Sequence, residues 1–302
     1  MSYRIRPGKP LTDEVARIAD HQYRQAIDIL YREPDGRHQA IHDARKRFKR
    51  LRGLFRLVRY GAPDFYADEN ARLRDTARTL STVRDATALV EALDRLSVDC
   101  AGGDNHGTLL AIRHRLAARR DRIAAAQTDL HARVSAAIAS CEDGVDALSG
   151  LSLPKGRKKA VGVLARGAAK NYGRARQALA RARETGDPAD WHDLRKRIKY
   201  HWMHTKLLRP AWPGVMKARA GVADLAGDAL GDDHDLTVLE ELVIAEPDEI
   251  GDATEIAVLR ACMKDHSLAL HERIGVIVKH LLHDDPDLFR SRIEALYRDA
   301  AD

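Results

Sequence analysis

The chain has 302 residues, with 51 Lys and Arg against 45 Asp and Glu and a formal charge of +6. This length allows one large domain or two halves that each bury a core, and the basic balance predicts an anionic partner. The three cysteines are widely spaced, which argues against a disulfide framework and a zinc site. The N-terminus lacks the apolar core of a signal peptide, and no uncharged run is long enough to span a membrane, so a cytoplasmic protein is expected.

Apolar residues recur at helical spacing along nearly the whole chain, and no alternating strand pattern runs between turn signals, so an all-α fold is predicted. The first helix is expected over about residues 12–32, the second over 39–60 and the third over 65–80, followed by a short fourth and a long last helix. After a break at 151–154, helices over about 159–184, 190–209 and 214–230, then a short and a long helix, repeat this order. Turn signals bound these helices at 33–36, 61–63, 101–104, 150–156, 185–188, 210–214, 246–248 and 284–286.

Two stretches that begin with His-Asp lie 150 positions apart in the chain. The eight residues from His42 share six identities with the eight from His192. The same offset aligns residues 80–89 with residues 230–239. Two separate matches at one spacing indicate an internal duplication, so two helical bundles are predicted, over residues 9–151 and 155–300.

The second pair of matching stretches carries an aspartate at corresponding positions. Asp85 and Asp235 are each expected to cap the N-terminus of the short fourth helix, in preference to a direct chemical role. Gly231 is expected to end the preceding helix of the second half, because glycine best tolerates a left-handed helix end.

Both His-Asp helices are predicted to carry a row of cations on one face and apolar residues on the other. With a turn of about 100° per residue, six side chains of the first helix fall within about 80° of the direction of the histidine. They form the first stripe: His42, Arg45, Lys46, Lys49, Arg52 and Arg56. The second stripe is His192, Arg195, Lys196, Lys199 and Lys206.

Such stripes are predicted to bind an anion. Like charges three and four positions apart repel, and only Asp43 or Asp193 lies near enough in sequence to offset them, so the stripes do not stabilise their helices. Each stripe begins in the first turn of its helix, where free N–H groups and the helix dipole attract phosphate. Two such helices are expected to line one groove for a long polyanion. Arg24 and Arg174, again 150 apart, are further candidate phosphate contacts, with an ordinary exposed arginine as the equal alternative.

The doubled pattern His-Asp-x-Arg with following basic residues, then Leu-Gly-x-x-x-Asp-x-x-Val-Leu, resembles the CHAD family, the conserved histidine α-helical domain. The resemblance covers nearly the whole chain from about Leu11, with Ser81 in place of a glycine and Trp202 at the position of Arg52. It implies one CHAD domain of two bundles related by a pseudo-two-fold axis, a basic central channel, inorganic polyphosphate as ligand, and association with polyphosphate granules. The motif falls on His42, Arg45, Lys49, Arg50 and Arg52, and on His192, Arg195, Lys196 and Lys199.

Two other functions are compatible with parts of the sequence. The His-Asp pairs and the run Asp232–Asp235 are similar to metal-dependent phosphohydrolases, but the adjacent cations would repel a metal ion. Charge alone also allows nucleic-acid binding, although neither stripe carries Asn or Gln, and Phe48 and Phe55 are on the apolar side. We therefore expect a stand-alone, non-catalytic binding module with neither metal nor cofactor.

Overall fold

The structure is a computed structural model that describes residues 3–80, 82–99 and 105–300. In these residues it contains eleven α-helices, three short 3-10 helices and no strand, which confirms the predicted all-α class. The helices in chain order are α1 (Leu11–Arg32), α2 (Arg37–Val58), α3 (Pro63–Thr79), α4 (Thr82–Asp99), α5 (His106–Ala125), α6 (Leu130–Ala147), α7 (Arg157–Thr185), α8 (Pro188–Leu207), α9 (Pro213–Ala245), α10 (Ala253–Leu281) and α11 (Pro286–Asp299).

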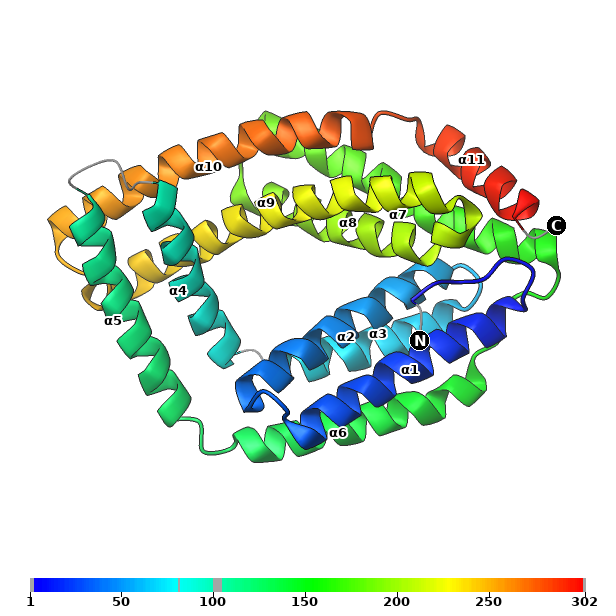
Figure 1. Ribbon diagram of the computed structural model, residues 1–302, viewed down its shortest axis with the longest axis horizontal. Coiled ribbons are helices and arrows are strands. Elements are labelled where there is room, and N and C mark those ends of the chain that lie inside the picture. Colours follow the sequence, from blue (N-terminus) through cyan, green and yellow to red (C-terminus); the bar gives the residue numbers. More distant parts are fainter. Residues whose placement is uncertain (1–2, 81, 100–104, 301–302) are drawn as a thin grey trace.

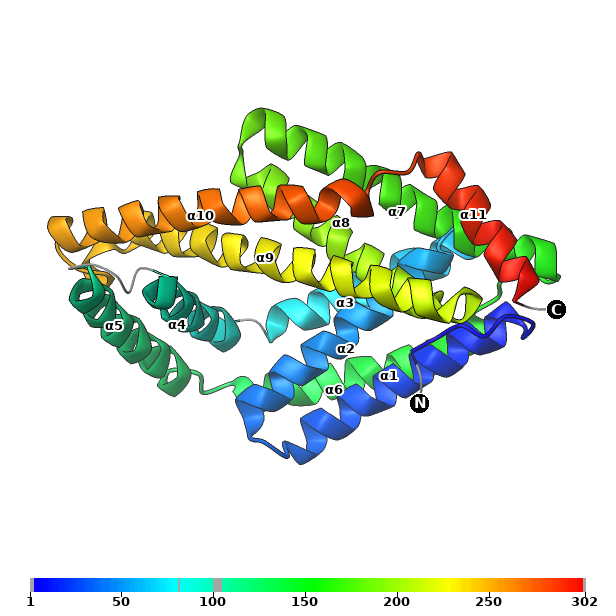
Figure 2. The same ribbon diagram turned by 45° about the horizontal axis from the view of Figure 1, so that its top comes forward.

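The helices form three packed groups (Figures 1 and 2). The first group consists of α1, α2, α3 and α6. The second consists of α7, α8, α11 and the beginning of α9. In the third group, α4 and α5 pack against α9 and α10, which come from the other half of the chain. The helix α2 also contacts α7 and α8, so the first two groups meet there.

One hydrophobic core runs through all three groups. Its largest fully buried side chains include Tyr23, Tyr172, Phe48 and Phe55, of which both phenylalanines are on the predicted apolar side of α2. Burial of such side chains contributes about 1.5 to 3 kcal/mol each relative to exposure. The apolar side of α2 therefore anchors this helix, and its opposite face is left to the first stripe.

Helix starts and ends follow the local chemistry of the sequence. The Asp187 side chain accepts a hydrogen bond from the Ala189 N–H and caps α8, with Pro188 at the first helical position. Gly186 ends α7 in the left-handed conformation, at φ 67°. The His-Asp helix of the second half is thereby fixed at its N-terminus, next to the end of α7.

The structure corrects the predicted course of the later helices. The third and fourth helices of the second half are one helix, α9, that continues through Gly231, so Asp235 lies in its interior and caps nothing. Asp85 is the fourth residue of α4, not its cap. Each predicted long last helix is two helices, α5 with α6 and α10 with α11.

Some predictions involve residues outside those that the structure describes. Ser81, Cys100 and the predicted break at 101–104 belong to this set. Cys141 and Cys262 are free and buried. A search of the described helices finds none that is long and apolar enough to cross a bilayer.

Candidate basic site on the two His-Asp helices

The first stripe lies partly against α3. Arg45 donates through Nη1 to the Ala77 carbonyl oxygen at 2.8 Å, and Arg52 donates through Nε to Asn70 Oδ1 at 3.1 Å. Lys46 and Lys49 are exposed, whereas the other members are half-buried. The neighbouring helix therefore fixes two arginines of the stripe through neutral acceptors.

The second stripe lies against α9 and meets carboxylates there. Lys199 Nζ forms an ion pair of 2.9 Å with Asp228 Oδ1. Burial lowers the pKa of Arg195, while the negative charges of Asp235, Asp232 and Asp228 act in the opposite direction. Only the motif aspartate is near these cations in sequence, but the packing of α8 on α9 brings three more carboxylates to the second stripe.

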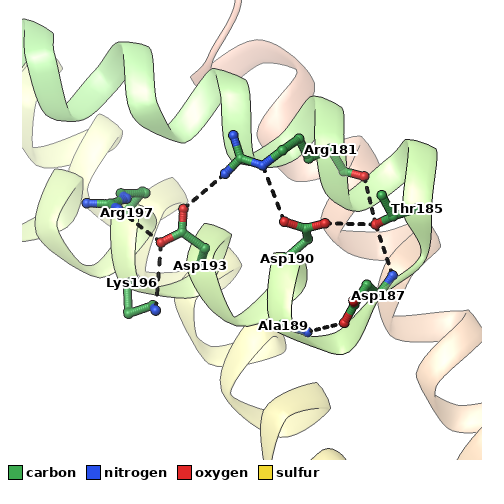
Figure 3. A network of polar contacts seen from close by, with 8 residues as sticks. All are labelled: Arg181, Thr185, Asp187, Ala189, Asp190, Asp193, Lys196 and Arg197. Carbon is green, nitrogen blue, oxygen red and sulfur yellow. Dashed lines mark hydrogen bonds and ion pairs between the residues drawn. The ribbon is translucent and has the colours of Figure 1, made fainter.

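The motif aspartate of α8 has a positioning role (Figure 3). Asp193 accepts a hydrogen bond from Arg197 at 3.0 Å and pairs with Arg181 of α7 at 3.3 Å and with Lys196 at 3.7 Å. Asp43 of α2 similarly accepts from Lys46 Nζ at 2.9 Å. The aspartate of each His-Asp pair thus orients cations of its own helix.

The motif histidine of α8 is half-buried beside another histidine. The rings of His192 and His234 lie 4.1 Å apart between centroids, and His192 Nδ1 is buried without a hydrogen-bond partner among the described residues. Burial lowers the pKa of His192, and the charges of Lys196 and Arg195 add to this effect. Burial and the charge of His192 also lower the pKa of His234, to about 4. Both rings are therefore neutral at pH 7.

The helices α2 and α8 meet at Gly53. A Cβ atom at this position would lie 2.5 Å from Met203 Sδ, so a larger residue would require the Met203 side chain to move. The Gly53 carbonyl oxygen is 3.2 Å from Nε2 of His204, which is fully buried. Burial, together with the charge of Arg56, lowers the pKa of His204 to about 3. The contact between the two His-Asp helices thus contains a neutral histidine.

The low pKa of His204 leads us to expect that the folded protein loses stability in mild acid. Below pH 6.5 the imidazole gains a proton in the unfolded chain, whereas the folded protein keeps it neutral until about pH 3. The free energy of unfolding should therefore fall by about 2 kcal/mol between about pH 7 and pH 5 through this group. Denaturant titration at both pH values should show that His204→Asn loses about 2 kcal/mol less than the parent.

The exposed His131 of α6 provides the control, because its replacement by glutamine should leave the pH dependence of the parent unchanged. An equal pH dependence in His204→Asn and the parent would contradict the assignment of this loss to His204.

A hollow of about 540 Å³ joins the two His-Asp helices on one side of their contact. Its lining includes Arg50 of α2 and Lys206 and Arg209 at the end of α8. Arg4, from the N-terminal segment, and Lys217 of α9 add two further cations, and Asp224 is the carboxylate of the lining. We call this the shared hollow. It brings two candidate residues, Arg50 and Lys206, together with three cations that the sequence did not single out.

The electrostatics of the shared hollow favour an anion. Burial lowers the pKa of Lys206, and the positive charges of Arg50, Arg209 and Arg4 lower it further against the effect of Asp224. The Lys206 ammonium lies 4.3 Å from the centroid of the Trp202 ring, and Arg209 Nε is buried without a hydrogen-bond partner among the described residues. Trp202, which stands at the position of Arg52, thus supports Lys206 through a cation–π contact.

Other candidate residues lie away from this hollow. Arg56 lies over Tyr200, 4.3 Å from the ring centroid, and Arg174 of α7 lies near it, on an arginine-rich surface. Arg24 forms an ion pair of 2.7 Å with Asp20 and is largely exposed. His42 lines a separate hollow of about 190 Å³ with Gln39, Glu91 and Arg133 among others. The predicted residues therefore form several basic surfaces.

Sequence reasoning missed functional candidates on other helices and segments. Arg4, Arg209 and Lys217 gave no periodic signal, because they reach the shared hollow from three separate elements. The carboxylates opposite the second stripe did leave a signal: Asp228, Asp232 and Asp235 have the i, i+4, i+7 spacing of one helix face.

Comparison with known proteins identifies the family of the chain. Among the described residues, no group of three or more His, Cys, Asp or Glu is arranged to hold a metal ion. A search of curated proteins finds no match to the sequence. The family model of the CHAD domain, in contrast, matches residues 18–243, which is most of the chain. With the doubled His-Asp helices in an all-α fold, this match shows that the chain belongs to the CHAD family.

Proposed function

We propose that the protein binds inorganic polyphosphate non-covalently through the basic surfaces of α2 and α8. In this proposal the chain is an internal duplication with a pseudo-two-fold axis, and a basic channel between its halves holds the polyanion. The protein does not hydrolyse the ligand, and it associates with polyphosphate granules. The shared hollow carries the proposal, because cations of both His-Asp helices line it.

The arrangement of the helices supports a duplication. α1 packs on α2 and α6 as α7 packs on α8 and α11, while α2 packs on α3 as α8 packs on α9. Residues 41–60 and 191–210 also show the same sequence of buried, half-buried and exposed positions, apart from the pair Lys49 and Lys199. The two His-Asp helices therefore resemble each other both in amino-acid sequence and in the pattern of buried positions.

The contact between α2 and α8 supports a two-fold relation. Gly53 and Met203 are 150 positions apart, the offset of the repeat, and they touch each other. A two-fold axis relates equivalent positions of the two halves, and the distance between two such positions grows with their distance from the axis. Equivalent residues that touch each other must therefore lie close to the axis. The shared hollow lies beside this contact, where side chains of both halves converge.

The charge of the shared hollow supports a phosphate ligand. Five cations and one carboxylate are in its lining. Arginine can bind phosphate oxygens with two parallel hydrogen bonds, and lysine adds a mobile point charge. A charge-assisted hydrogen bond of this kind contributes about 1.5 to 3 kcal/mol when sheltered, and less where solvent screens it, so several contacts must act together. A linear polyanion meets this requirement better than a single phosphate does.

Binding of long-chain polyphosphate by the full chain should be strongly salt-dependent. The affinity is expected to fall at least tenfold between about 50 and 200 mM salt, because the polyanion gives up counterions on binding. Fluorescence titration with labelled polyphosphate measures this, and a phosphate-release assay should detect no turnover. Affinity that is independent of salt would overturn the proposal.

Competition separates polyphosphate from nucleic acid. At equal phosphate concentration, unlabelled long-chain polyphosphate should displace the labelled ligand more effectively than duplex DNA does. Equal displacement by both would instead support the nucleic-acid alternative, since a row of cations alone does not distinguish the two backbones.

A further inference from the structure

A third row of cations lies on α7, outside both stripes. Arg166, Lys170 and Arg174 are four positions apart and line one hollow of about 360 Å³. None of the three forms an ion pair with a carboxylate among the described residues, whereas Arg181 of the same helix pairs with Asp190 at 3.3 Å. Like charges at this spacing destabilise a helix, so the row has no evident structural benefit.

The corresponding positions of α1 do not repeat this row. At an offset of 150, Ala16 and Asp20 stand where α7 has Arg166 and Lys170. Asp20 moreover forms an ion pair of 2.7 Å with Arg24, the residue that corresponds to Arg174. The row is therefore specific to the second half of the chain, and a ligand that requires it has one site per molecule.

An aromatic ring just beyond the end of α2 holds two arginines at this place. Arg166 lies 4.2 Å and Arg59 4.7 Å from the centroid of the Tyr60 ring, and Arg59 Nη2 donates to the Tyr60 hydroxyl at 2.9 Å. Stacking on a ring fixes a guanidinium group but leaves its charge and most of its N–H donors available. Tyr60 thus preorganises cations without neutralising them.

The surrounding charges make this arrangement unfavourable in the absence of an anion. Burial lowers the pKa of Arg174, and the positive charges of Arg59, Arg197 and Arg56 lower it further. Two of these neighbours, Arg56 and Arg197, each have a buried Nε without a hydrogen-bond partner among the described residues. Neither of them lines the hollow, but phosphoryl groups beside Arg174 would offset the repulsion among these guanidinium groups.

We propose that the hollow between α7 and α11 is a separate site for a compact anion with several phosphoryl groups, with inorganic triphosphate as the test ligand. We call it the α7 hollow; its side chains include Tyr60, Arg166, Lys170, Arg174, Arg290 and Asp287. Its volume is at the small end of the range of about 300 to 1,000 Å³ for ligand pockets, which favours a short anion over a long chain. Asp287 is the carboxylate of the lining and opposes an anion of any length, but four cations line the same hollow.

Isothermal titration of the full chain with inorganic triphosphate tests this site. Arg166 is exposed, so Arg166→Glu should keep the fold, and we expect it to weaken the tightest triphosphate site at least about tenfold. Tyr60→Phe keeps the ring and should retain most of the affinity, whereas Tyr60→Ala should lose it. The exposed Lys264 of α10 offers a control with the same charge change, and Lys264→Glu should stay within about twofold of the parent.

The outcomes distinguish this site from the proposed polyphosphate function. Arg50→Glu, in the shared hollow, should leave the tightest triphosphate site intact. If long-chain polyphosphate does not bind but triphosphate binding depends on Arg166, only the polyphosphate proposal fails. The proposal of a binding site in the α7 hollow is overturned if Arg166→Glu leaves the triphosphate affinity unchanged. It is also overturned if Lys264→Glu loses as much affinity as Arg166→Glu does.

Discussion

Replacing Gly167 of α7 with alanine is expected to lower the free energy of unfolding by about 3 kcal/mol. The new Cβ atom would lie 1.8 Å from the Leu57 carbonyl oxygen of α2, and a main-chain atom cannot move aside by changing a rotamer. The two helices must therefore separate or bend. Chemical denaturation of the parent and the variant, followed by circular dichroism, measures the difference.

Gly162 on the same helix provides a matched control. A Cβ atom at this position meets no other atom within 4 Å, so Gly162→Ala should stabilise the protein by about 0.5 to 1 kcal/mol through helix propensity. Gly53→Ala should be intermediate, because its Cβ would meet the flexible Met203 side chain. A loss in Gly162→Ala equal to that in Gly167→Ala would show that the approach to Leu57 is unimportant.

The early helices of each half could be predicted from the sequence to within about three residues. The periodicity of α1, α2, α7 and α8 is regular, and proline or glycine marks the ends of these helices. The apolar side of α2 was predicted for the same reason, since Phe48 and Phe55 share one face of a 3.6-residue repeat. Local pattern was sufficient wherever one face of a helix is buried.

The course of α9 could not be predicted from local pattern. Gly231 indicated a helix end, but α9 continues through it, and a Cβ there would make only ordinary contact, at 3.7 Å, with the Arg195 guanidinium of α8. One turn earlier, a Cβ on Gly227 would lie 3.0 Å from Lys199 Nζ. Gly227 therefore serves the close packing of α8 on α9, which overrides its weak helix propensity.

The sequence predicted the candidate site only in part, because local pattern does not show which distant elements pack against a helix. The two stripes follow from the helical repeat, but their partners come from elements distant in the sequence. Arg95 of α4 pairs with Asp235 of α9 at 2.6 Å, and Arg166 of α7 stacks on Tyr60, which follows the end of α2. Helical spacing shows which side chains share a face, and tertiary packing decides what that face meets.

The largest functional effect is expected from the double variant Arg50→Glu with Lys206→Glu. Both side chains are half-buried in the shared hollow, one on each His-Asp helix. Reversal of one contact should weaken binding of long-chain polyphosphate about tenfold, and reversal of both about 100-fold or more. Arg45 is less suitable for this test, because its hydrogen bond to the Ala77 carbonyl also holds the end of α3.

Exposed lysines of α10 supply the matched control for this variant. Lys264→Glu with Lys279→Glu changes the net charge by the same amount, and neither lysine lines the shared hollow. The control should bind within about threefold of the parent, because exposed charges at a distance are screened by salt. The shared-hollow variant should also lose about one unit or more of the slope of log K against log salt, since two phosphate contacts are removed. If the control loses as much affinity as the shared-hollow variant, net charge rather than the crossing of the two His-Asp helices governs binding.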